Sequence, residues 1–423
     1  MSIIDKFGEL VKSRIVEHPG SANDLLYCGY YADYIKNKFT KGSQLPHRSY
    51  GAAVTNRVIR AGMKHSEMTA LVNVFFPCEI LHAMNILPQF VEGAASYLNG
   101  AKAEKGFIDF AEKSGIPKTH CSYHKTLLGA YKSKVFRPSA FVATTSMACD
   151  ANTLTFRDVA ESSGAPYFII DVPKAESEES VQYVKSQLSD FIRFAELNTG
   201  VKFETDALYR VMEREKATLE LFRKYYQQLA GKFIPGDMTA EMYRIFFSHI
   251  LMGTEESRRY FELLLTDVGL ASNFDDMEKP LRLYWVHTMP FWQMSFRELF
   301  NGSERYQLVA SDLNLDYLEL PDLSDPLGSL AHKLLYNVMN GSAADRAKLA
   351  IKNCRDLHCD GAVIFNHWGC KKTIGGSVLM KNMLNEAGIP CLVLDGDGCD
   401  RANVNDGQMR TKMEAYLEML KNV

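Results

Sequence analysis

The chain has 423 residues, of which 46% are hydrophobic and 23% charged, and its formal net charge at pH 7 is −3. This composition is ordinary for a globular protein with a large buried core, and the length is typical of two or three domains. The small acidic excess argues against a nucleic-acid partner, because a non-specific nucleic-acid binder would carry a strong basic excess.

The N-terminal part of the chain predicts helices followed by a first strand. The stretches IIDKFGELVKSRIVEH (3–18) and DLLYCGYYADYIKNKF (24–39) favour helices, so we expect a helical segment over residues 1–60. The next region, LVNVFFPCEILHAMNIL (71–87), predicts a strand over 71–76, a Pro-Cys-Glu turn and a helix. Its polar interruptions exclude a membrane span. Since no basic stretch precedes an apolar N-terminal segment, we expect a cytoplasmic protein without membrane contact.

The rest of the chain alternates between two patterns. Residues 139–173 repeat a strand–loop–helix–strand theme, which completes a first α/β domain expected over residues 61–185. Residues 186–278 carry apolar side chains at three-to-four spacing, which predicts a block of amphipathic helices. From 279 to 423 the strand–helix alternation returns, with one helix expected over 330–357, and it predicts a second α/β domain with a parallel sheet. We therefore expect two similar doubly wound domains, flavodoxin- or Rossmann-like, separated by the helical block.

Two segments of the chain share one pattern. AFVATTSMACDANTLTFRDVAESSGAPYFIIDVP (140–173) and AVIFNHWGCKKTIGGSVLMKNMLNEAGIPCLVLDGD (362–397) each run strand, polar loop, cysteine, helix, Gly-x-Pro, strand and aspartate. This pattern places Cys149 and Cys370 just past the carboxyl ends of parallel strands, where open sheets bind ligands and helix N-termini favour anions. Two lobes that face each other across a cleft would bring both cysteines to one site.

The cysteines predict a metal centre built from distant positions. There are nine, an odd number for a disulfide framework, and no CxxC pattern indicates a zinc finger or ribbon. Cys121, in HCSYHKTLLGAY (120–131), precedes the unit that contains Cys149. Three thiolates from two domains could hold an iron–sulfur cluster, for which four are usual. The alternative is that these cysteines are buried and pack as small hydrophobic side chains.

Five stretches carry a family resemblance. They are CSYHKTLLGAY (121–131), TTSMACD (144–150), SDPLGSL (324–330), HWGCKK (367–372) and DGDGCDRANVNDGQMRTKMEAYLEML (395–420). In this order they resemble the 2-hydroxyacyl-CoA dehydratase family, which also includes the ATP-dependent benzoyl-CoA reductases. The resemblance extends from about residue 65 to the end of the sequence and is strongest in its final part.

The resemblance implies a [4Fe–4S] cluster held by three cysteines, with one iron left open to substrate. By motif, the ligands in this sequence would be Cys121, Cys149 and Cys370. A related branch of the family carries a double cubane and needs a further cysteine where this chain has Asn73, so we expect a single cubane. The chain has no GxxxxGK[ST] motif, so we expect it to bind no nucleotide itself.

The resemblance also implies a reaction and its partners. A separate ATP-hydrolysing iron–sulfur activator would inject one electron, and the cluster would pass it to the thioester carbonyl of a (R)-2-hydroxyacyl-CoA. The resulting ketyl radical anion would expel the hydroxyl at C2. Loss of a proton from C3 and return of the electron would then give an (E)-2-enoyl-CoA. Members of the family form heterodimers, so we expect a second homologous subunit in addition to the activator and the acyl-CoA substrate.

Three other interpretations stay open at this point. The chain could be a subunit of a benzoyl-CoA-type reductase, which reduces an aromatic thioester instead of removing water. It could be a non-catalytic partner subunit whose cluster relays electrons or stabilises the dimer. It could also be an α/β protein with buried thiols and no metal. Iron and sulfide content would separate the last of these from the others.

Further residues are candidates near such a site. Glu79 follows a strand and opens a helix, so it could be a general base or a first-turn glutamate favoured by the helix dipole. Cys78 and Cys399 follow strands and could touch the cluster, and the loop HTMPFWQM (287–294) is expected to line the substrate pocket. The remaining candidates have equally good structural roles: His124, Lys371, Lys372, Trp368 and Thr144 to Ser146.

Overall fold

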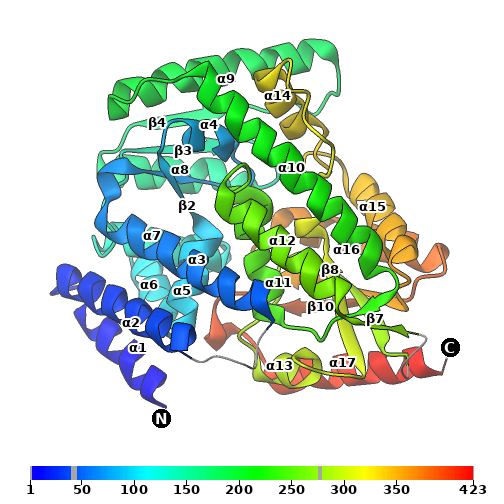
Figure 1. Ribbon diagram of the computed structural model, residues 1–423. Helices are drawn as coiled ribbons and strands as arrows, with labels where there is room; N and C mark the ends of the chain where they lie inside the picture. Colours follow the sequence, from blue (N-terminus) through cyan, green and yellow to red (C-terminus); the bar gives the residue numbers. More distant parts are fainter. Residues whose placement is uncertain (1, 40–44, 275–278, 423) are drawn as a thin grey trace.

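The structure is a computed structural model that describes residues 2–39, 45–274 and 279–422. Two four-stranded parallel sheets form its centre (Figure 1). The first sheet has the order β2-β1-β3-β4, with β1 Thr69–Val72, β2 Leu87–Phe90, β3 Phe141–Thr145 and β4 Tyr167–Ile170. The second has the order β10-β9-β7-β8, with β7 Leu281–Val286, β8 Tyr306–Ser311, β9 Gly361–His367 and β10 Cys391–Gly396.

Both sheets have the same topology. When the strands are numbered within each sheet, both run 2-1-3-4, which is the beginning of the flavodoxin-like order. β3 and β9 are the third strands, and each lies beside the first strand of its sheet, where the strand order reverses. The prediction of two similar doubly wound parallel sheets is therefore confirmed, and the two segments that share a sequence pattern occupy equivalent positions.

Helices cover both faces of the second sheet. Successive residues along its strands therefore pack alternately against the helices of one face and those of the other. Leu283, Trp285 and Phe365 belong to a core that includes α17 (Asp406–Lys421). Their neighbours Tyr284 and Ile364 belong to the core that includes α15 (Ala343–Asp356) and α16 (Lys371–Glu386). Because both faces are buried, β9 is apolar on both, which explains why its sequence is a continuous apolar run.

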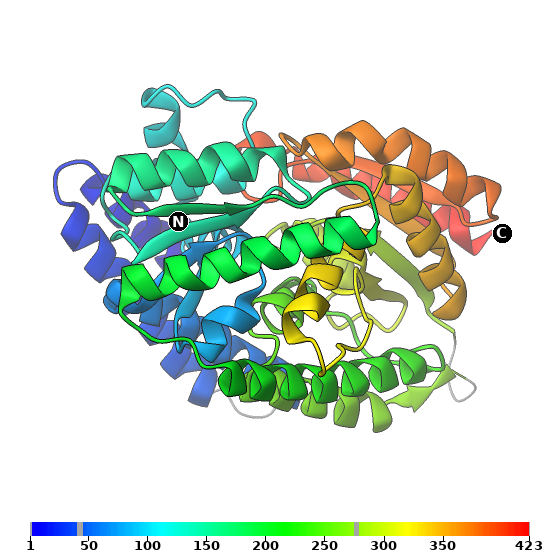
Figure 2. The ribbon, with the colours of Figure 1, turned by 90° about the horizontal axis from the view of Figure 1, so that it is seen from above.

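The first sheet is covered in the same way. Figure 2 shows α8 (Asp150–Ser163) and α9 (Glu178–Thr199) on opposite sides of β3 and β4. The other helices around this sheet are α4 (Cys78–Ala83), α5 (Val91–Gly100), α6 (Glu104–Lys113) and α7 (Ser122–Lys132). Beside the second sheet, α13 (Met294–Phe300) packs against β8 and α17. α14 (Pro326–Tyr336) packs mainly against α9.

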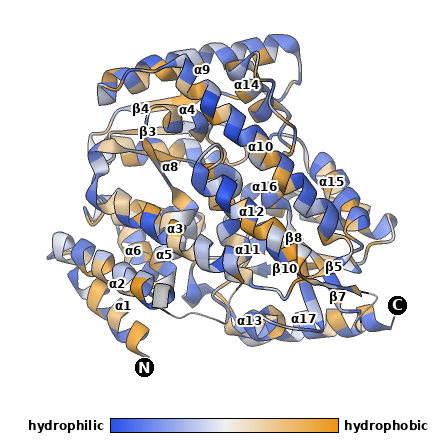
Figure 3. Cartoon of the chain, in the orientation of Figure 1, coloured by the Kyte–Doolittle hydropathy of each residue, from blue (hydrophilic) through white to orange (hydrophobic). Residues whose placement is uncertain are grey.

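Long helices outside the two sheets join the parts of the chain. The N-terminal helices are α1 (Ile3–Arg14), α2 (Pro19–Phe39) and α3 (Pro46–Lys64). After α9, the central block contains α10 (Thr205–Leu229), α11 (Met238–Ile245), a π-helical turn (Phe246–Ile250) and α12 (Glu255–Gly269). Strands β5 (Lys232–Phe233) and β6 (Ser272–Asn273) form a short antiparallel pair. Figure 3 shows hydrophilic and hydrophobic residues interspersed along α10 and α12, as expected for helices with one buried stripe.

The structure differs from the sequence-based expectation at four places. The strand predicted over 71–76 begins earlier and is shorter, because β1 is Thr69–Val72. The predicted helix over 79–87 ends early, and Leu87–Phe90 form edge strand β2, because Asn85 adopts a positive φ of 56° that stops the helix. The expected helix over 330–357 is two helices, α14 and α15. The predicted start of the helical block, residue 186, lies inside α9, which packs against β4, and its predicted end at 278 lies outside the described residues.

The domain limits 61–185, 186–278 and 279–423 stay predictions, since no boundary between domains is assigned in the structure. Among the residues that the structure describes, no helix is both long enough and apolar enough to cross a membrane.

Candidate functional site

Each of the three predicted cysteine ligands caps a helix N-terminus. Cys121 precedes α7, Cys149 precedes α8 and Cys370 precedes α16. Cys149 follows β3 and Cys370 follows β9, so both lie at the carboxyl edge of a third strand. All three line one pocket. The arrangement directs three helix dipoles at this pocket, which favours negative charge there.

The backbone in front of two of these cysteines is unusual. Ala148 has a φ of +68° and Gly369 a φ of +89°, so the chain turns sharply just before Cys149 and Cys370. A Cβ atom on Gly369 would lie only 2.6 Å from the Cα and the backbone nitrogen of Cys121. Glycine at this position therefore allows the second sheet's loop to pack directly against the backbone of the first domain's cysteine.

We expect Gly369→Ala to disturb the contact between the two domains. The strain at positive φ costs about 1–3 kcal/mol, and the clash with Cys121 adds to it. Gly388→Ala is a matched control, because Gly388 has a φ of +80° but open space around its Cβ position. Urea unfolding should show a larger loss of stability for Gly369→Ala than for Gly388→Ala, and equal losses would contradict the packing argument.

The pocket that the cysteines line is mostly apolar and opens to solvent. It holds about 920 Å³, counted out to its open mouth. Its apolar lining comes from the first domain, the helical block and the second domain, and includes Phe75, Phe90, Tyr243, Phe246, Leu313 and Met339. Its polar lining includes Glu92, His124, His287, Arg346 and Lys372. A concave apolar site with a few convergent polar groups is the usual form of a site for a small organic ligand.

The three thiols share one electrostatic environment. Burial raises the pKa of Cys121 well above the usual thiol value, and negative charge on Cys149 and Cys370 would raise it further. Burial also raises the pKa of Cys149 to about 12, again with a contribution from Cys370. In the absence of metal, Cys121 and Cys149 are therefore neutral thiols at pH 7. Cationic iron would favour the thiolate forms, because ligation removes the proton and compensates the charge.

The three thiols line the pocket without forming a site for one metal ion. In residues 2–39, 45–274 and 279–422, no group of three or more His, Cys, Asp or Glu side chains could hold a single metal ion. A cubane carries its irons on separate corners, so its thiolate ligands lie further apart than the ligands of one ion. The donor set, three cysteines without a carboxylate or histidine among them, is the kind that holds an iron–sulfur cluster.

Glu92 is a pocket residue that the sequence analysis missed. It lies in the first turn of α5, just past the carboxyl end of β2. Its Oε2 is buried without a hydrogen-bond partner, and burial raises its pKa to about 7, with a smaller contribution from Cys370. The strand–glutamate–helix signal that makes Glu79 a candidate is present here as well. It is hidden because the sequence pattern extends the preceding helix to residue 87.

Glu79 has a structural partner and does not line the pocket. Its Oε1 accepts a hydrogen bond of 2.7 Å from the Nζ of Lys333, which also donates to Glu215 at 2.8 Å. Burial raises the pKa of Glu215 to about 7, Lys333 opposes this shift and Glu79 adds to it. The geometry thus supports a role for Glu79 in joining α4, α10 and α14, and gives no support to Glu79 as the catalytic base.

We expect Lys333→Met to lower the free energy of unfolding by about 3–5 kcal/mol at pH 8, because it leaves two buried carboxylates without a cation. The loss should shrink below pH 7, where protonation of Glu215 relieves the repulsion. Lys352→Met is a matched control, since Lys352 pairs with Asp356 on an exposed helix surface, and it should cost less than about 0.5 kcal/mol. Urea unfolding at both pH values would test this, and a loss independent of pH would contradict it.

The other predicted candidates fall into two groups. His124 and Lys372 line the pocket, and the loop over 287–294 contributes His287 and Thr288 to it. Burial lowers the pKa of His124 to about 3 and that of Lys372 to about 8, where Lys174 and Arg346 add to the effect. The candidates that do not line it are Cys78, Cys399, Lys371, Trp368, Thr144, Thr145 and Ser146. Trp368 is 41% exposed, so it is neither core nor a buried shield for the cysteines.

Asn73 occupies the position where the double-cubane branch would need a cysteine. Its side chain donates to the hydroxyl of Thr145 at 3.0 Å and accepts from the Thr145 backbone N–H at 3.0 Å. Asn73 therefore ties the end of β1 to the end of β3 and has a structural role at this edge of the sheet.

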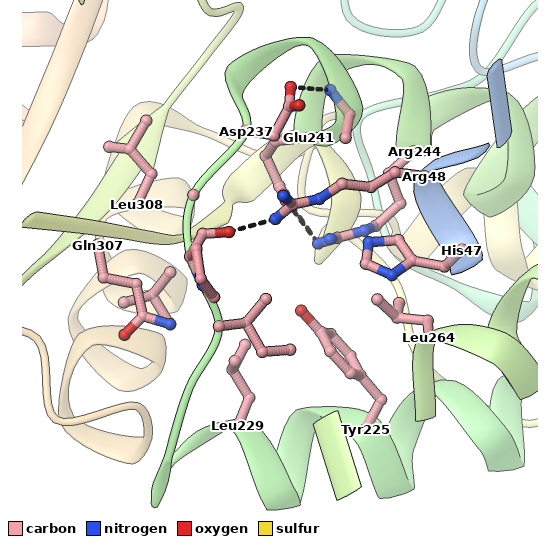
Figure 4. Close-up of a pocket in the computed structure, with 15 residues that line it drawn as sticks. His47, Arg48, Tyr225, Leu229, Asp237, Glu241, Arg244, Leu264, Gln307 and Leu308 are labelled. Atoms are coloured by element: carbon pink, nitrogen blue, oxygen red, sulfur yellow. Dashed lines mark hydrogen bonds and ion pairs between the residues drawn. The ribbon is translucent and has the colours of Figure 1, made fainter. Parts of the chain in front are cut away.

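A second, smaller pocket lies between α3, α10, α11 and β8 (Figure 4). His47 Nδ1 lies 2.6 Å from Asp267 Oδ2, and Arg244 pairs with Glu241 at 2.7 Å. Arg48 donates to the carbonyl of Pro235. Because each of these charged side chains has a partner within the chain, the pocket has a structural role and links the N-terminal helices to the central block.

Known proteins resemble this chain over most of its length. It is 19% identical over 371 residues to the (R)-phenyllactyl-CoA dehydratase alpha subunit of Clostridium sporogenes, covering 82% of this chain and 88% of that protein. It is 23% identical over 313 residues to the alpha subunit of (R)-2-hydroxyglutaryl-CoA dehydratase of Acidaminococcus fermentans, covering 70% and 63%. It is 22% identical over 386 residues to a benzoyl-CoA reductase subunit of Thauera aromatica, covering 83% and 88%.

These identities are low, but a family match does not depend on any single relative. The family described as 2-hydroxyglutaryl-CoA dehydratase, D-component, matches residues 73–420, a range that contains the three cysteines and Glu92. The match covers far more than half of the chain, from the end of β1 to the end of α17. With two like sheets, a shared pocket and this match along both domains, the chain belongs to the 2-hydroxyglutaryl-CoA dehydratase, D-component, family.

Proposed function

We propose that this chain is the iron–sulfur subunit of a 2-hydroxyacyl-CoA dehydratase, a lyase that converts a (R)-2-hydroxyacyl-CoA into an (E)-2-enoyl-CoA and water. One observation carries the proposal: three cysteines from two domains cap three helices around a single apolar pocket. Family membership and the names of the relatives support the reaction class.

Cys121, Cys149 and Cys370 would hold a [4Fe–4S] cluster at this pocket. The donor set fits, because the thiols line one cavity and burial raises the pKa of Cys121 and Cys149 unless a cation compensates their charge. The cluster would supply the single electron that makes the thioester reactive. Three protein ligands would leave a fourth iron for the substrate side of the pocket.

The residues of the chain itself would orient the substrate and move a proton. The aromatic and aliphatic lining displaces water from the acyl chain and keeps the dielectric constant low. Glu92 opens α5 at the pocket wall, and its raised pKa suits a group that accepts a proton near neutral pH. The neutral imidazoles of His124 and His287, whose pKa values burial lowers to about 3, add no positive charge to the site.

Two protein partners are part of this proposal. The relatives are named as single subunits of larger enzymes, which supports a second subunit for this chain as well. The sequence has no GxxxxGK[ST] motif, which supports a separate ATP-hydrolysing activator as the source of the electron.

Anaerobic purification tests the proposal directly. The chain, with any subunit that copurifies, should contain about four irons and four sulfides per chain. The reduced cluster should change its EPR spectrum when a 2-hydroxyacyl-CoA is added, because substrate approaches the open iron. A colourless, iron-free protein would refute the cluster, and a cluster that never responds to any acyl-CoA would favour an electron-relay subunit.

A benzoyl-CoA-type reductase is the second candidate, favoured by the match to a subunit of benzoyl-CoA reductase and by the aromatic pocket lining. The two reactions differ in their products. A dehydratase yields an enoyl-CoA and returns its electron, whereas a reductase consumes electrons in every turnover. Product analysis with (R)-phenyllactyl-CoA and benzoyl-CoA, together with a count of electrons consumed, separates them.

A further inference from the structure

His367 ends strand β9 and reaches from the second domain to a cysteine of the first. Its Nε2 lies 3.1 Å from the Sγ of Cys121. Its other ring nitrogen, Nδ1, accepts a hydrogen bond of 3.0 Å from the backbone N–H of Gly398. A nitrogen that accepts an N–H bond carries no proton, so the proton of the neutral ring is assigned to Nε2. The imidazole therefore donates its N–H to the sulfur of Cys121.

The surroundings of His367 hold this tautomer and orientation in place. The side chain is buried, and its ring packs against that of Tyr123 with 5.2 Å between the centroids. The carbonyl of Gly398, whose N–H binds the imidazole, accepts hydrogen bonds from Tyr123 at 3.0 Å and from Trp292 at 2.8 Å. The donor to Cys121 is thus held in place by contacts with side chains of both domains.

Cys121 differs in this respect from the other two cysteines. The side-chain contact of Cys149 is to His124 Nε2 at 3.9 Å, and that of Cys370 is to the hydroxyl of Thr373 at 3.6 Å. The distance between Cys121 Sγ and His367 Nε2 is shorter than either of these two distances. In addition, the tautomer of the His367 ring is assigned, so Nε2 is known to be the donor. A hydrogen bond to a thiolate ligand stabilises the more negative, reduced state of a cluster and raises its reduction potential.

We propose that His367 sets the reduction potential of the cluster by donating an N–H bond to the sulfur of Cys121. This inference rests on the proposed function, because it requires the cluster. It makes His367 a positioning residue that acts through a ligand and need not touch the substrate. The bond keeps the potential of the cluster within reach of its electron donor, at a site whose apolar lining alone would drive the potential lower.

The same geometry argues against a catalytic pair in which Cys121 is a nucleophile and His367 its general base. A cysteine next to a histidine can form such a pair when the imidazole accepts the thiol proton. Here Nε2 already carries a proton because Nδ1 accepts from Gly398. The ring cannot take a second proton without losing that hydrogen bond. The contact is therefore suited to stabilise a thiolate that has been formed by metal binding.

A redox titration followed by EPR tests the proposal without measuring turnover. Wild type, His367→Leu and His367→Gln are titrated anaerobically with titanium(III) citrate, in whatever subunit complex copurifies. At a fixed potential, His367→Leu should have a ratio of reduced to oxidised cluster about tenfold smaller, which is a downward shift of 59 mV for one electron. His367→Gln keeps an N–H donor and should lie between wild type and His367→Leu.

His124→Gln is the matched control, because His124 also faces a cysteine ligand but at the longer distance of 3.9 Å. The reduction potential of the cluster in His124→Gln should differ from the wild-type value by less than half of the difference found for His367→Leu. In wild type, electron–nuclear double resonance should also detect an exchangeable proton coupled to the reduced cluster, and this signal should be lost in His367→Leu.

The outcomes separate this inference from the proposed function. If wild type contains no cluster, the proposed function fails. If wild type holds a normal cluster and the potential of His367→Leu is unchanged, the role of His367 fails alone. If His367→Leu takes up no iron, its potential cannot be measured. The role of His367 is then tested by the exchangeable-proton signal of wild type and by the reduction potential of the cluster in His367→Gln. Absence of that proton in wild type contradicts the hydrogen bond.

Discussion

Replacement of Cys370 by serine should deprive the chain of most of its iron and leave its fold intact. Cys370 is the second domain's cysteine in the pocket, and the proposed cluster bridges it to Cys121 and Cys149. A serine hydroxyl is a hard, protonated donor and a poor substitute for a thiolate. We expect iron to fall from about four to less than one per chain after anaerobic purification.

The fold should tolerate this change, because Cys370 is only partly buried and caps α16 without a side-chain cap hydrogen bond. The free energy of unfolding of the metal-free chain should change by less than about 1 kcal/mol. Cys391→Ser is the matched control, since Cys391 is also in the second domain but opens β10 away from the pocket. It should keep its iron. A Cys370→Ser chain with full iron content would refute the ligand assignment.

The placement of Cys149 and Cys370 was predictable because it depends on local pattern. An apolar run, a short polar loop and a helix define a strand end wherever they occur, and parallel strands place their carboxyl ends at one edge. The repeat of this pattern at 140–173 and 362–397 predicted two like sheets, and the structure shows them with the same strand order. Cys121 was harder to place, because it follows a loop and was linked to the others mainly through the family resemblance.

The partners of charged and polar groups were not predictable, because they depend on contacts between distant segments. Glu79 binds Lys333, which lies 254 positions away, and His367 binds Cys121, 246 positions away. Neither pair can be recognised from the spacing of residues within a short stretch of the sequence. Glu92 was missed for another reason: the helix predicted up to Leu87 hid edge strand β2, so Glu92 was not recognised as a residue that follows a strand and opens a helix.

Glu92→Gln should lower the turnover of the dehydratase by about 10²- to 10⁴-fold, the range for loss of a general base. Glutamine keeps the size of the side chain but cannot accept the proton. Iron content and the EPR spectrum of the reduced cluster should stay as in wild type, because Glu92 is not a ligand in this proposal. Glu79→Gln is the control: it should weaken the fold through loss of the Lys333 pair, with turnover within about tenfold of wild type. Equal losses of turnover in both variants would remove Glu92 from its proposed role.

The pH dependence gives a second test of Glu92. Burial raises its pKa from 4.5 to about 7, so the carboxylate that acts as a base becomes the main form as the pH rises through 7, and turnover should rise with it. Between pH 4.5 and 7 the folded chain holds a proton on Glu92 that the unfolded chain has lost. Its contribution to the free energy of unfolding therefore falls by about 3 kcal/mol across this window and is constant outside it. Since Glu92→Gln cannot ionise, it should lose both the rise in turnover and this fall in stability, and a variant that kept either would show that another group titrates.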